Sequence, residues 1–463
     1  MFMNQIESVT KTPIKLAILG GGVAGITLAS ELSKYSVFDI DILEKSSVLG
    51  GLHQNININN LNYDIGLFLF SNSYGLFEFY PEIADFYVPV NSQQLRSSLT
   101  PKGNIDKYPM SIEGYIEDYG LLKFFYACVE IIASKIIYYK RNTLSSWIKY
   151  YIGNSIYKDS GLKAYIERLY GTTDENIDIE FAKKRLSAVK RVGSLRTVLS
   201  RIFTLKNVEN LFKNDKSNSL QGSTFKTLVR PQEGFGKIYN DIIKNSLRSR
   251  EVLVYTNCQL KNIKILDKGF EIEFSDNRKK IYDNLISTIP LEALSLAIGK
   301  PLDFQIEYRA LCSLFYRFNG NLGYKNAVLN NFTKEGAWKR IITFSKYYGK
   351  YEGDDYFAVE ITVENNKSIN KEQLREKFES HIKSLGLFQG ELKYQGDIVI
   401  KNAYPCYTRD LVNKVATTKN YFKELGIDLL GRQGEFDYIS ANDAIVNAKK
   451  LADKIQAKYG IEK

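Results

Sequence analysis

The pattern of apolar and polar residues predicts a strand, a helix and a second strand at the start of the chain. Ile14 to Leu19 is an apolar run of strand length, Ile26 to Leu32 follows a helical spacing, and Phe38 to Leu43 is again a strand. Later segments repeat these patterns, with a helix over Lys237 to Leu247, strands over Val252 to Tyr255, Phe270 to Phe274 and Asp428 to Leu430, a loop over Gly431 to Tyr438 and a helix over Ala441 to Lys454. Strands and helices therefore alternate, as in the α/β class.

Glycines fill the turn between the first strand and the first helix. Gly20, Gly22 and Gly25 have the G-x-G-x-x-G spacing, in which they allow a tight turn, a close approach of backbone to a pyrophosphate, and close packing of helix on strand. The start of the helix then offers free N–H groups to the phosphates. Glu44 ends the second strand about twenty residues later, where a carboxylate accepts hydrogen bonds from a ribose. The arrangement predicts a dinucleotide site.

One long apolar stretch raises the question of a membrane. Leu121 to Tyr139 is mostly apolar, but Lys123, Glu130 and Lys135 interrupt it, whereas a spanning helix needs about 20 residues with few charges. We expect an amphipathic helix with its charges on one side. Two roles stay open for it: packing onto the fold, or docking on a membrane surface as a peripheral contact.

The composition is that of a globular protein with a basic excess. The 463 residues carry 63 Lys and Arg against 52 Asp and Glu, a net charge of +11, and 44% of them are hydrophobic. These values exclude wholesale disorder, collagen and a polytopic membrane protein. Cys128, Cys258, Cys312 and Cys406 make no paired spacing and the chain has 2 His, so neither a disulfide framework nor a metal site is predicted. Together with an N-terminus without a signal-peptide pattern, this predicts a cytoplasmic location.

Basic residues gather in one acid-free stretch between Glu180 and Glu209. Such a stretch is typical of a site for an anion such as a diphosphate, but equally of a solvated helix face or a lipid-headgroup patch. No nucleic-acid-binding motif accompanies it, so no nucleic-acid partner is predicted. The polar segment from Asn207 to Lys226 is expected to be a loop. The basic residues are Lys183, Lys184, Arg185, Lys190, Arg191, Arg196, Arg201 and Lys206.

Glu44 to Gly51 decides which dinucleotide is expected, because it resembles the E-x-x-x-x-x-G-G extension of the FAD-dependent amine-oxidase-type flavoproteins. Tyr63 to Gly66 resembles the family's next segment, beside the flavin ring, and Arg230 to Gly236 its P-x-G-G-x-G turn, with Glu233 in place of one glycine. The resemblance implies FAD as cofactor. The residues it implies for binding are Gly20, Gly22, Val23, Ala24, Gly25, Glu44, Lys45, Gly50, Gly51, Leu52, Gly66, Leu67, Leu260, Gly431, Arg432, Tyr438, Ser440, Ala441 and Asn442.

The order of these motifs implies an interleaved fold. Leu285 to Pro290 resembles the family's strand that returns to the FAD domain, and Gly431 to Asn442 is similar to the last FAD motif of UDP-galactopyranose mutases and protoporphyrinogen-oxidase-like proteins. The expected class is α/β, with a Rossmann-like FAD domain of the GR2 type interleaved with an α+β substrate domain. The FAD domain is expected over 13–70, 223–295 and 395–463, and the substrate domain over 71–222 and 296–394, with a helical region near 110–205.

Several further segments resemble the mutase branch. Tyr165 to Gly171 is similar to its Y-T-E-K-x-W-G segment, Ile306 to Leu311 to L-E-Y-R-S-L, Trp338 to Ile341 to P-Y-T-R-I, and Ala403 to Pro405 to its Y-P-V segment. The resemblance implies Tyr170, Arg185, Arg309, Arg340, Tyr404 and Tyr438 at the substrate, of which Arg340, Arg309 and Tyr404 are the catalytic candidates.

Two departures concern the substrate more than the FAD. Gly66 to Phe70 lacks the histidine that mutases have beside the flavin, and Thr343 stands where they have an acidic residue.

The resemblance implies one of two chemistries. In the first, reduced flavin attacks the anomeric carbon of a nucleotide-linked sugar, and pyranose and furanose interconvert, as in surface glycan biosynthesis. In the second, oxidised flavin takes hydride from an apolar or sugar substrate, as in protoporphyrinogen oxidases, desaturases and amine oxidases. Both leave the chemistry to the flavin and ask the protein for position and charge. We expect the first, with an anionic small molecule as partner.

Overall fold

A parallel sheet built from three separated parts of the chain contains the two strands expected at the start of the sequence. In the computed structural model, which describes residues 12–92, 95–179, 186, 189–190, 226–365 and 367–461, its order is β10-β2-β1-β14-β20. All neighbouring pairs run parallel. The strands are β1 (Ile14–Leu19), β2 (Phe38–Leu43), β10 (Leu253–Tyr255), β14 (Asn284–Ser287) and β20 (Ile427–Leu429).

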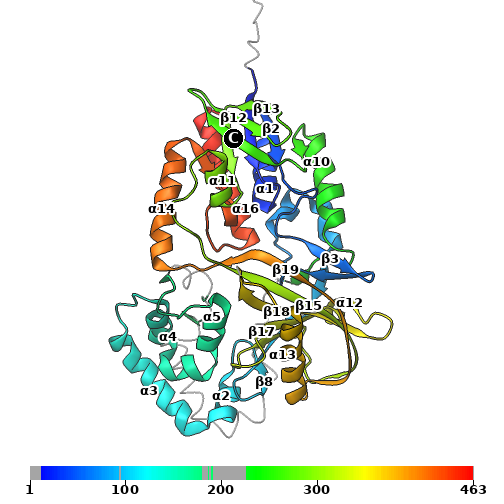
Figure 1. The fold of residues 1–463 in the computed structure, drawn as a ribbon, viewed down its shortest axis with the longest axis vertical. Helices are drawn as coiled ribbons and strands as arrows, with labels where there is room; N and C mark the ends of the chain where they lie inside the picture. The colour runs from blue at the N-terminus through cyan, green and yellow to red at the C-terminus, as the bar shows by residue number, and fades with distance from the viewer. Residues whose placement is uncertain are drawn as a thin grey trace, which may run out of the picture.

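Both faces of this sheet are covered, as an all-parallel sheet requires. In β1, Leu16 and Ile18 pack into one apolar core with α1 (Val23–Leu32), α16 (Ala441–Lys458) and the turns η4 (Lys237–Ile243) and α10 (Lys244–Ser249). Ala17 and Leu19 face a second core. That core contains α11 (Leu291–Ala297), α14 (Arg409–Glu424) and the antiparallel strands β11 (Leu260–Ile265), β12 (Phe270–Phe274) and β13 (Lys279–Tyr282). Figure 1 shows this layered part at the top.

A long mixed sheet forms the centre of the molecule, below the parallel sheet in Figure 1. Its order is β19-β15-β18-β17-β16-β7-β8. One face packs against α13 (Lys371–Ser384) through Phe378 and Ile382, and the other packs against Leu61 and Tyr63. The strands are β7 (Arg96–Leu99), β8 (Ile105–Lys107), β15 (Tyr308–Leu322), β16 (Val328–Asn331), β17 (Trp338–Thr343), β18 (Asp355–Glu364) and β19 (Phe388–Pro405).

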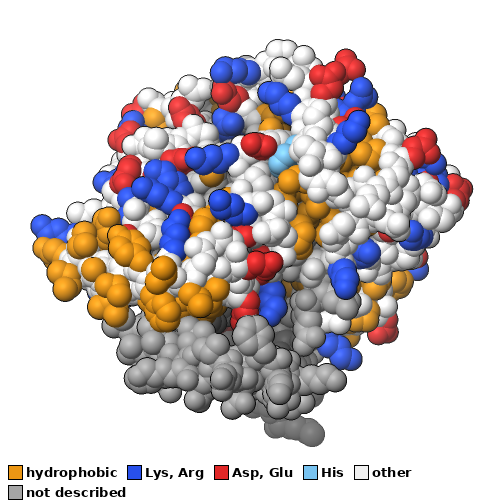
Figure 2. Space-filling view, turned by 90° about the horizontal axis from the view of Figure 1, so that it is seen from below, with side chains coloured by type: hydrophobic (Ala, Val, Ile, Leu, Met, Phe, Trp, Pro, Cys, Tyr) orange, Lys and Arg blue, Asp and Glu red, His pale blue; other side chains and the backbone are white. Residues whose placement is uncertain are grey.

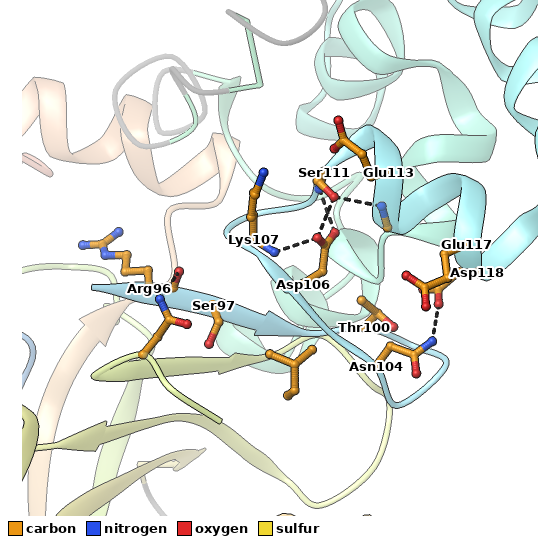
Figure 3. Close-up of a pocket in the computed structure, with 13 residues that line it drawn as sticks. Arg96, Ser97, Thr100, Asn104, Asp106, Lys107, Ser111, Glu113, Glu117 and Asp118 are labelled. Carbon is orange, nitrogen blue, oxygen red and sulfur yellow. Dashed lines mark hydrogen bonds between the residues drawn. The ribbon is translucent and has the colours of Figure 1, made fainter. Parts of the chain in front are cut away.

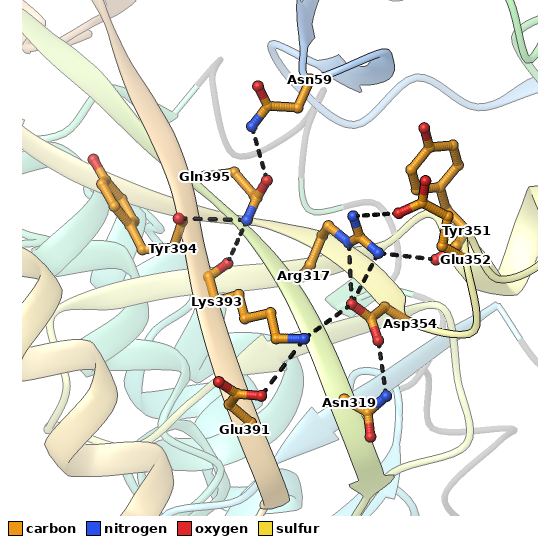
Figure 4. Close-up of polar contacts among 10 residues, drawn as sticks. All are labelled: Asn59, Arg317, Asn319, Tyr351, Glu352, Asp354, Glu391, Lys393, Tyr394 and Gln395. Atoms are coloured by element: carbon orange, nitrogen blue, oxygen red, sulfur yellow. Dashed lines mark hydrogen bonds and ion pairs between the residues drawn. The ribbon is translucent and has the colours of Figure 1, made fainter.

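A hairpin from the first part of the chain lies on this central sheet. It consists of β3 (Asn55–Ile58) and β4 (Leu61–Asp64), and Asn59 at its tip donates a hydrogen bond of 3.0 Å to Gln395 Oε1 on β19. Beside it, Arg317 Nη2 lies 3.0 Å from Asp354 Oδ2, which Lys393 also approaches at 3.6 Å (Figure 4). The Asn59 contact therefore ties the hairpin to the central sheet, and the charged contacts beside it hold that part of the sheet together.

A helical part extends from the opposite side of the central sheet, at the lower left of Figure 1. It contains α2 (Ile112–Tyr119), α3 (Leu121–Ile137), α4 (Leu144–Asp159) and α5 (Leu162–Tyr170). Smaller elements connect the parts: β5 (Phe70–Ser71), β6 (Val88–Val90), β9 (Thr227–Val229), η1 (Gly75–Glu78), η2 (Pro81–Phe86), α12 (Ser345–Tyr348) and α15 (Gly431–Gly434).

The structure confirms most of the elements expected from the sequence and corrects two. The helix expected over Lys237 to Leu247 begins as a wider π-type turn and continues as α10. The loop expected from Gly431 contains the short helix α15. In α3 the charged residues lie on one side of the helix, as expected, and all three turn toward α4. The mixed α/β class with a Rossmann-like sheet is confirmed. The domain limits stay a prediction.

Candidate functional site

The start of α1 is built to meet an anion. Gly22 caps the helix without a side-chain hydrogen bond, and the first turn contains no acidic residue. The N–H groups of Val23, Ala24 and Gly25 therefore point outward at the positive end of the helix dipole. A Cβ at Gly25 would lie 2.2 Å from Gly20 O, so glycine there allows α1 to pack against the end of β1.

A second glycine turn lies against the first. Gly50 N donates a 2.9 Å hydrogen bond to Gly21 O, and Gly50 bridges to Gly22 as in a parallel ladder. A Cβ at Gly51 would lie 2.9 Å from Gly22 Cα, and its φ of +61° also favours glycine. Gly22 itself is different, because a Cβ there would meet only Gly51 Cα at 3.7 Å. The two loops thus form a side-chain-free surface next to the start of α1.

Glu44 lies at the edge of this surface, at the end of β2. Gly21 N donates to its Oε2 at 2.7 Å and Ser46 N donates to its Oε1 at 2.8 Å. A carboxylate has about four acceptor positions, so both oxygens keep capacity for a ribose hydroxyl. Cys258 N donates 2.8 Å to Glu44 O, which brings the chain that leads to Leu260 alongside.

The C-terminal motif reaches the same place from the other end of the chain. A Cβ at Gly431 would lie 2.8 Å from Ala24 Cβ, and one at Gly434 would lie 2.4 Å from Ser287 O. These two glycines allow α15 to pack on both α1 and the end of β14. Arg432 lies over the ring of Tyr438, with 4.3 Å between its guanidinium carbon and the ring centroid.

The remaining expected cofactor residues occupy more varied places. Lys45 and Leu52 are exposed beside the glycine turns. Gly66 and Leu67 follow β4, where Leu67 packs against the apolar core that contains Ile342 and Phe344. Ser440 caps α16 in a capping box with Asp443, Ala441 begins that helix, and Asn442 Oδ1 accepts a 3.0 Å hydrogen bond from Gly75 N.

His53, which the sequence analysis did not assign to the site, follows the second glycine turn. Its Nδ1 lies 2.6 Å from Tyr239 Oη, its ring stacks on Phe235 at 5.3 Å, and Phe68 and Phe70 lie edge-on at the same distance. Burial lowers the pKa of His53 to about 4, so the ring is neutral at neutral pH. A pattern of aromatic residues after the Gly50 turn is the sequence signal for such an enclosed ring.

A buried ion pair holds the Tyr63 to Gly66 segment in place. Asp64 accepts from Arg230 Nε, and Arg230 also donates to Asn62 O at 2.6 Å and Pro231 O at 2.6 Å. Arg230 is fully buried. The guanidinium thus joins β4 to the turn before η4, in the two stretches that resemble flavin-side motifs.

A cluster of charged residues lies on the central sheet, and a β-bulge creates it. The register of β17 on β18 shifts between Trp338 and Arg340, so Lys339 is an extra residue. A bulge re-aims side chains, and here both cations reach one carboxylate. Lys339 Nζ lies 3.0 Å and Arg340 Nε 2.8 Å from Glu360 Oε2, and Lys339 also donates to Tyr404 Oη at 2.9 Å.

Arg309 belongs to the same cluster, because its partner across the β15–β19 ladder is Tyr404. Its guanidinium crosses the end of α5, where a Cβ at Gly171 would lie 2.6 Å from Nη1. Arg309 Nε is buried and has no hydrogen-bond partner in the part of the chain that the structure describes. Glu364, opposite it on β18, pairs with Lys367 at 2.6 Å, and the charges of Lys367 and Arg309 both lower its pKa. We call Arg309, Lys339, Arg340, Glu360 and Tyr404 the cationic cluster.

The cationic cluster keeps its charges despite burial. Burial alone would raise the pKa of Glu360, but Arg340 and Lys339 together hold that pKa below its ordinary value. Burial alone would lower the pKa of Arg340, but Glu360 and the nearby phenols of Tyr404 and Tyr165 raise it. Two cations, Lys339 and Arg340, then share one carboxylate, which leaves an excess of positive charge where the dielectric constant is low.

The structure thus brings together three of the expected substrate residues, Arg309, Arg340 and Tyr404. Tyr170 is buried next to them, where its carbonyl accepts from Cys406 Sγ at 3.4 Å. Tyr438 lies elsewhere and lines a separate cavity of about 190 Å³ with residues of α14. Arg185 lies outside the described residues, as does the basic stretch except Lys190, which is exposed.

Sequence analysis missed Lys339 and Glu360 as members of the site. Thr343 stands after Arg340 at the position where mutases have an acidic residue. Here Glu360 supplies a carboxylate from the neighbouring strand instead. The available signal is a charged residue inside the apolar run of β18, since a buried Glu needs a partner.

Another cavity, of about 400 Å³, lies apart from both groups, between β7, β8 and the start of α2. Figure 3 shows Arg96 and Lys107 toward one end and Glu117 and Asp118 toward the other. Asp106 accepts from Ser111 N at 2.7 Å and from Ser111 Oγ at 2.6 Å, so it serves the cap of α2.

Comparisons with known proteins agree with the layered fold. Residues 18–88 match the family model described as an NAD(P)-binding Rossmann-like domain. This stretch contains the two glycine turns and Glu44, so a Rossmann-like dinucleotide-binding fold is confirmed. No curated protein sequence matches the chain.

Solved structures share the fold along nearly the whole chain. Reduced UDP-galactopyranose mutase superposes with a TM-score of 0.71 and 17% identity over 96% of this chain and 94% of the mutase. A protein described as a putative protoporphyrinogen oxidase from Exiguobacterium sp. 255-15 superposes with a TM-score of 0.65 and 13% identity. The match covers 96% of this chain and 99% of that protein. A fatty acid isomerase from P. acnes that produces CLA superposes with a TM-score of 0.57 and 14% identity. The match covers 95% of this chain and 98% of the isomerase. The chain therefore has the fold shared by these proteins, as its motifs implied.

Proposed function

We propose that the protein is an FAD-dependent enzyme acting on an anionic, nucleotide-linked sugar, in the manner of a UDP-galactopyranose mutase. The main support for this proposal is Arg309. Its buried Nε lacks a hydrogen-bond partner among the described residues, and it belongs to a cluster with an excess of positive charge. An unpaired buried guanidinium nitrogen is costly unless a ligand completes it.

The glycine turns support FAD as the cofactor. The surface over Gly22 and Gly51 has no side chain to obstruct a pyrophosphate, and the unpaired N–H groups of α1 adjoin it. Glu44 would accept from the ribose of the adenosine half, with Leu260 beside the base. Arg432, from α15, would lie near the other half and balance negative charge there.

The cationic cluster supports a diphosphate as the part of the substrate that the protein holds. Arg309 and Arg340 would each offer planar donors to its oxygens, and Lys339 a point charge. Tyr404 would orient Lys339 and close the site on the side of β19. In this arrangement the protein positions the sugar and balances the charge of the leaving diphosphate. FAD, when bound, supplies a nucleophile if reduced and a hydride acceptor if oxidised.

The test is an activity assay at two redox states. The purified flavoprotein is reduced with dithionite, incubated with a panel of sugar nucleotides, and the products are separated. Isomerisation only in the reduced state is the expected result. A colourless protein that takes up no FAD would refute the proposal as a whole, and Gly22→Asp should abolish cofactor retention because it adds a negative charge beside the pyrophosphate.

A second candidate is an FAD-dependent oxidoreductase that takes hydride from an apolar or sugar substrate. It is favoured by the apolar segment Gly66 to Phe70, which carries no histidine, and by the aromatic surroundings of His53. In anaerobic mixtures this enzyme would bleach its flavin when substrate is added and would form no isomer. Such bleaching would replace the first proposal by the second.

A further inference from the structure

The outer face of α3 is apolar and bare. Leu122 is 89% exposed and Ile136 79% exposed, whereas large apolar side chains of folded proteins are mostly buried. Figure 2 shows apolar side chains crowded at one corner of the molecule. The exposed apolar residues of this stretch are Leu121, Leu122, Phe125, Tyr126, Val129, Ile132, Ile136, Ile137 and Tyr139. We call them the α3 face.

The opposite face of the same helix is also apolar. Phe124, Ala127, Cys128 and Ile131 are buried against α4. A helix that is hydrophobic all round belongs in a core or in contact with lipid, not half in water. Packing on the fold therefore uses one side of α3 and leaves the other side unexplained.

The charged residues of α3 are withdrawn from its outer face. Lys123 Nζ lies 2.9 Å from Asp159 Oδ2, Glu130 accepts a 2.8 Å hydrogen bond from Ser155 N, and Lys135 donates 2.6 Å to Tyr150 O. Each partner belongs to α4, which contains the kink at Gly153 that frees Ser155 N for Glu130. The α3 face thus keeps no charge of its own.

Positive charge borders the end of the α3 face instead. Lys140, which is exposed, and Arg141 follow directly after Tyr139, and the acidic residues Glu113 and Glu117 lie on α2 at the other end. Tyrosines, such as Tyr126 and Tyr139 here, favour the boundary between hydrocarbon and water. This combination of apolar face, tyrosines and basic end is typical of a helix that lies in the plane of an anionic membrane.

We propose that the α3 face docks on a membrane surface containing anionic lipid, with its basic end nearest the headgroups. Lipid is favoured over a second copy of the chain as the occupant because tyrosines and a basic end border the apolar face, as in helices that lie at a membrane surface. None of the helices that the structure describes is long and apolar enough to cross a membrane, so α3 lies on the surface in this proposal.

Sedimentation of the full chain with lipid vesicles tests the docking. We expect it to sediment with phosphatidylcholine vesicles that contain phosphatidylglycerol and less with phosphatidylcholine alone. Leu122→Glu and Ile136→Glu should each lower binding about tenfold or more, since a carboxylate cannot enter the hydrocarbon. Leu296→Glu is the matched control, because Leu296 is 69% exposed on α11, away from α3, and it should leave binding unchanged.

Charge reversal and self-association complete the test. Lys140→Glu should weaken binding to the anionic vesicles about fivefold and leave binding to phosphatidylcholine alone unchanged. No sedimentation of the wild-type chain with either vesicle would overturn the proposal, and so would equal losses in Ile136→Glu and Leu296→Glu. A dimer in sedimentation velocity that Ile136→Glu dissociates, without vesicle binding, would assign the face to a second copy.

Discussion

The glycine turns around α1 and the cationic cluster on the central sheet are built in opposite ways. At α1 the ligand surface consists of backbone, and glycine at positions 22 and 51 lets two loops lie against each other at Gly22 and Gly51. In the cluster the surface is made of side chains whose charges are held in place by each other, through Glu360. One region gains function by leaving space and the other by filling it with charge.

This difference predicts different weaknesses. A backbone site does not tolerate an added methyl group, since the ligand needs the space. A charged cluster tolerates small changes of volume but not the loss of one partner, because the remaining ions stay buried without compensation. Four changes separate the two regions by these criteria.

Glu360→Gln should have the largest effect. The variant keeps the shape of the side chain but leaves Lys339 and Arg340 buried without a carboxylate, so we expect the free energy of unfolding to fall by about 3 to 5 kcal/mol. Urea denaturation followed by circular dichroism measures this. The control is Glu352→Gln, because Glu352 is 63% exposed and pairs with Arg317 at 2.9 Å, and its loss should cost less than about 1 kcal/mol. Equal losses in the two variants would contradict the cluster.

Acid should weaken the region around the glycine turns through His53. Its pKa is about 4 in the folded chain against an ordinary 6.5, so the folded state binds fewer protons between these values. The stabilising contribution is complete above pH 6.5 and is lost as the pH falls toward 4, by up to about 3 kcal/mol. The measurement compares the slope of unfolding free energy against pH in wild type and His53→Gln. A variant slope as steep as that of wild type would show that His53 is not the responsible group.

The sequence predicted the first region well because its determinants are local. β1, β2 and β12 lie where their apolar patterns placed them, and Gly20, Gly22 and Gly25 lie within six residues of the strand that they follow. Turn, helix start and strand end are all fixed by neighbours in the chain, so spacing alone carries the information.

The cationic cluster was only half predictable, because its members meet through long-range pairing. Arg309, Arg340 and Tyr404 were found through motifs, but Lys339 points to the same site only because of a bulge between β17 and β18. Glu360 comes from a strand with no recognised motif. A bulge adds one residue to a ladder and leaves no mark in an apolar pattern, so the place of Lys339 did not follow from the sequence. The charges of α3 lie on one side of the helix, as expected, but their partners on α4 did not follow from the sequence.

Gly22→Ala should weaken FAD binding about 100-fold, or about 3 kcal/mol, while the chain stays as stable as before. The added methyl group would meet protein only at 3.7 Å, an ordinary contact, so a collision with the cofactor is the expected cause of any loss. Fluorescence titration of the apoprotein with FAD measures the affinity, and thermal unfolding checks the fold. A stable Gly22→Ala variant that binds FAD like wild type would mean that the pyrophosphate lies elsewhere.

Tyr404→Phe should have the smallest effect and yet separates two roles of the cationic cluster. The variant removes the hydroxyl that accepts from Lys339 at 2.9 Å and leaves the ring beneath the ammonium, 4.6 Å from its centroid. The ion pair with Glu360 remains, so the unfolding free energy should fall by only about 1 kcal/mol, the net contribution of one hydrogen bond. If Tyr404 also orients Lys339 for a diphosphate, KM for the sugar nucleotide should rise while kcat changes little, because binding is lost and not the chemistry. A fall in kcat at constant KM would instead place the hydroxyl at the reacting atoms.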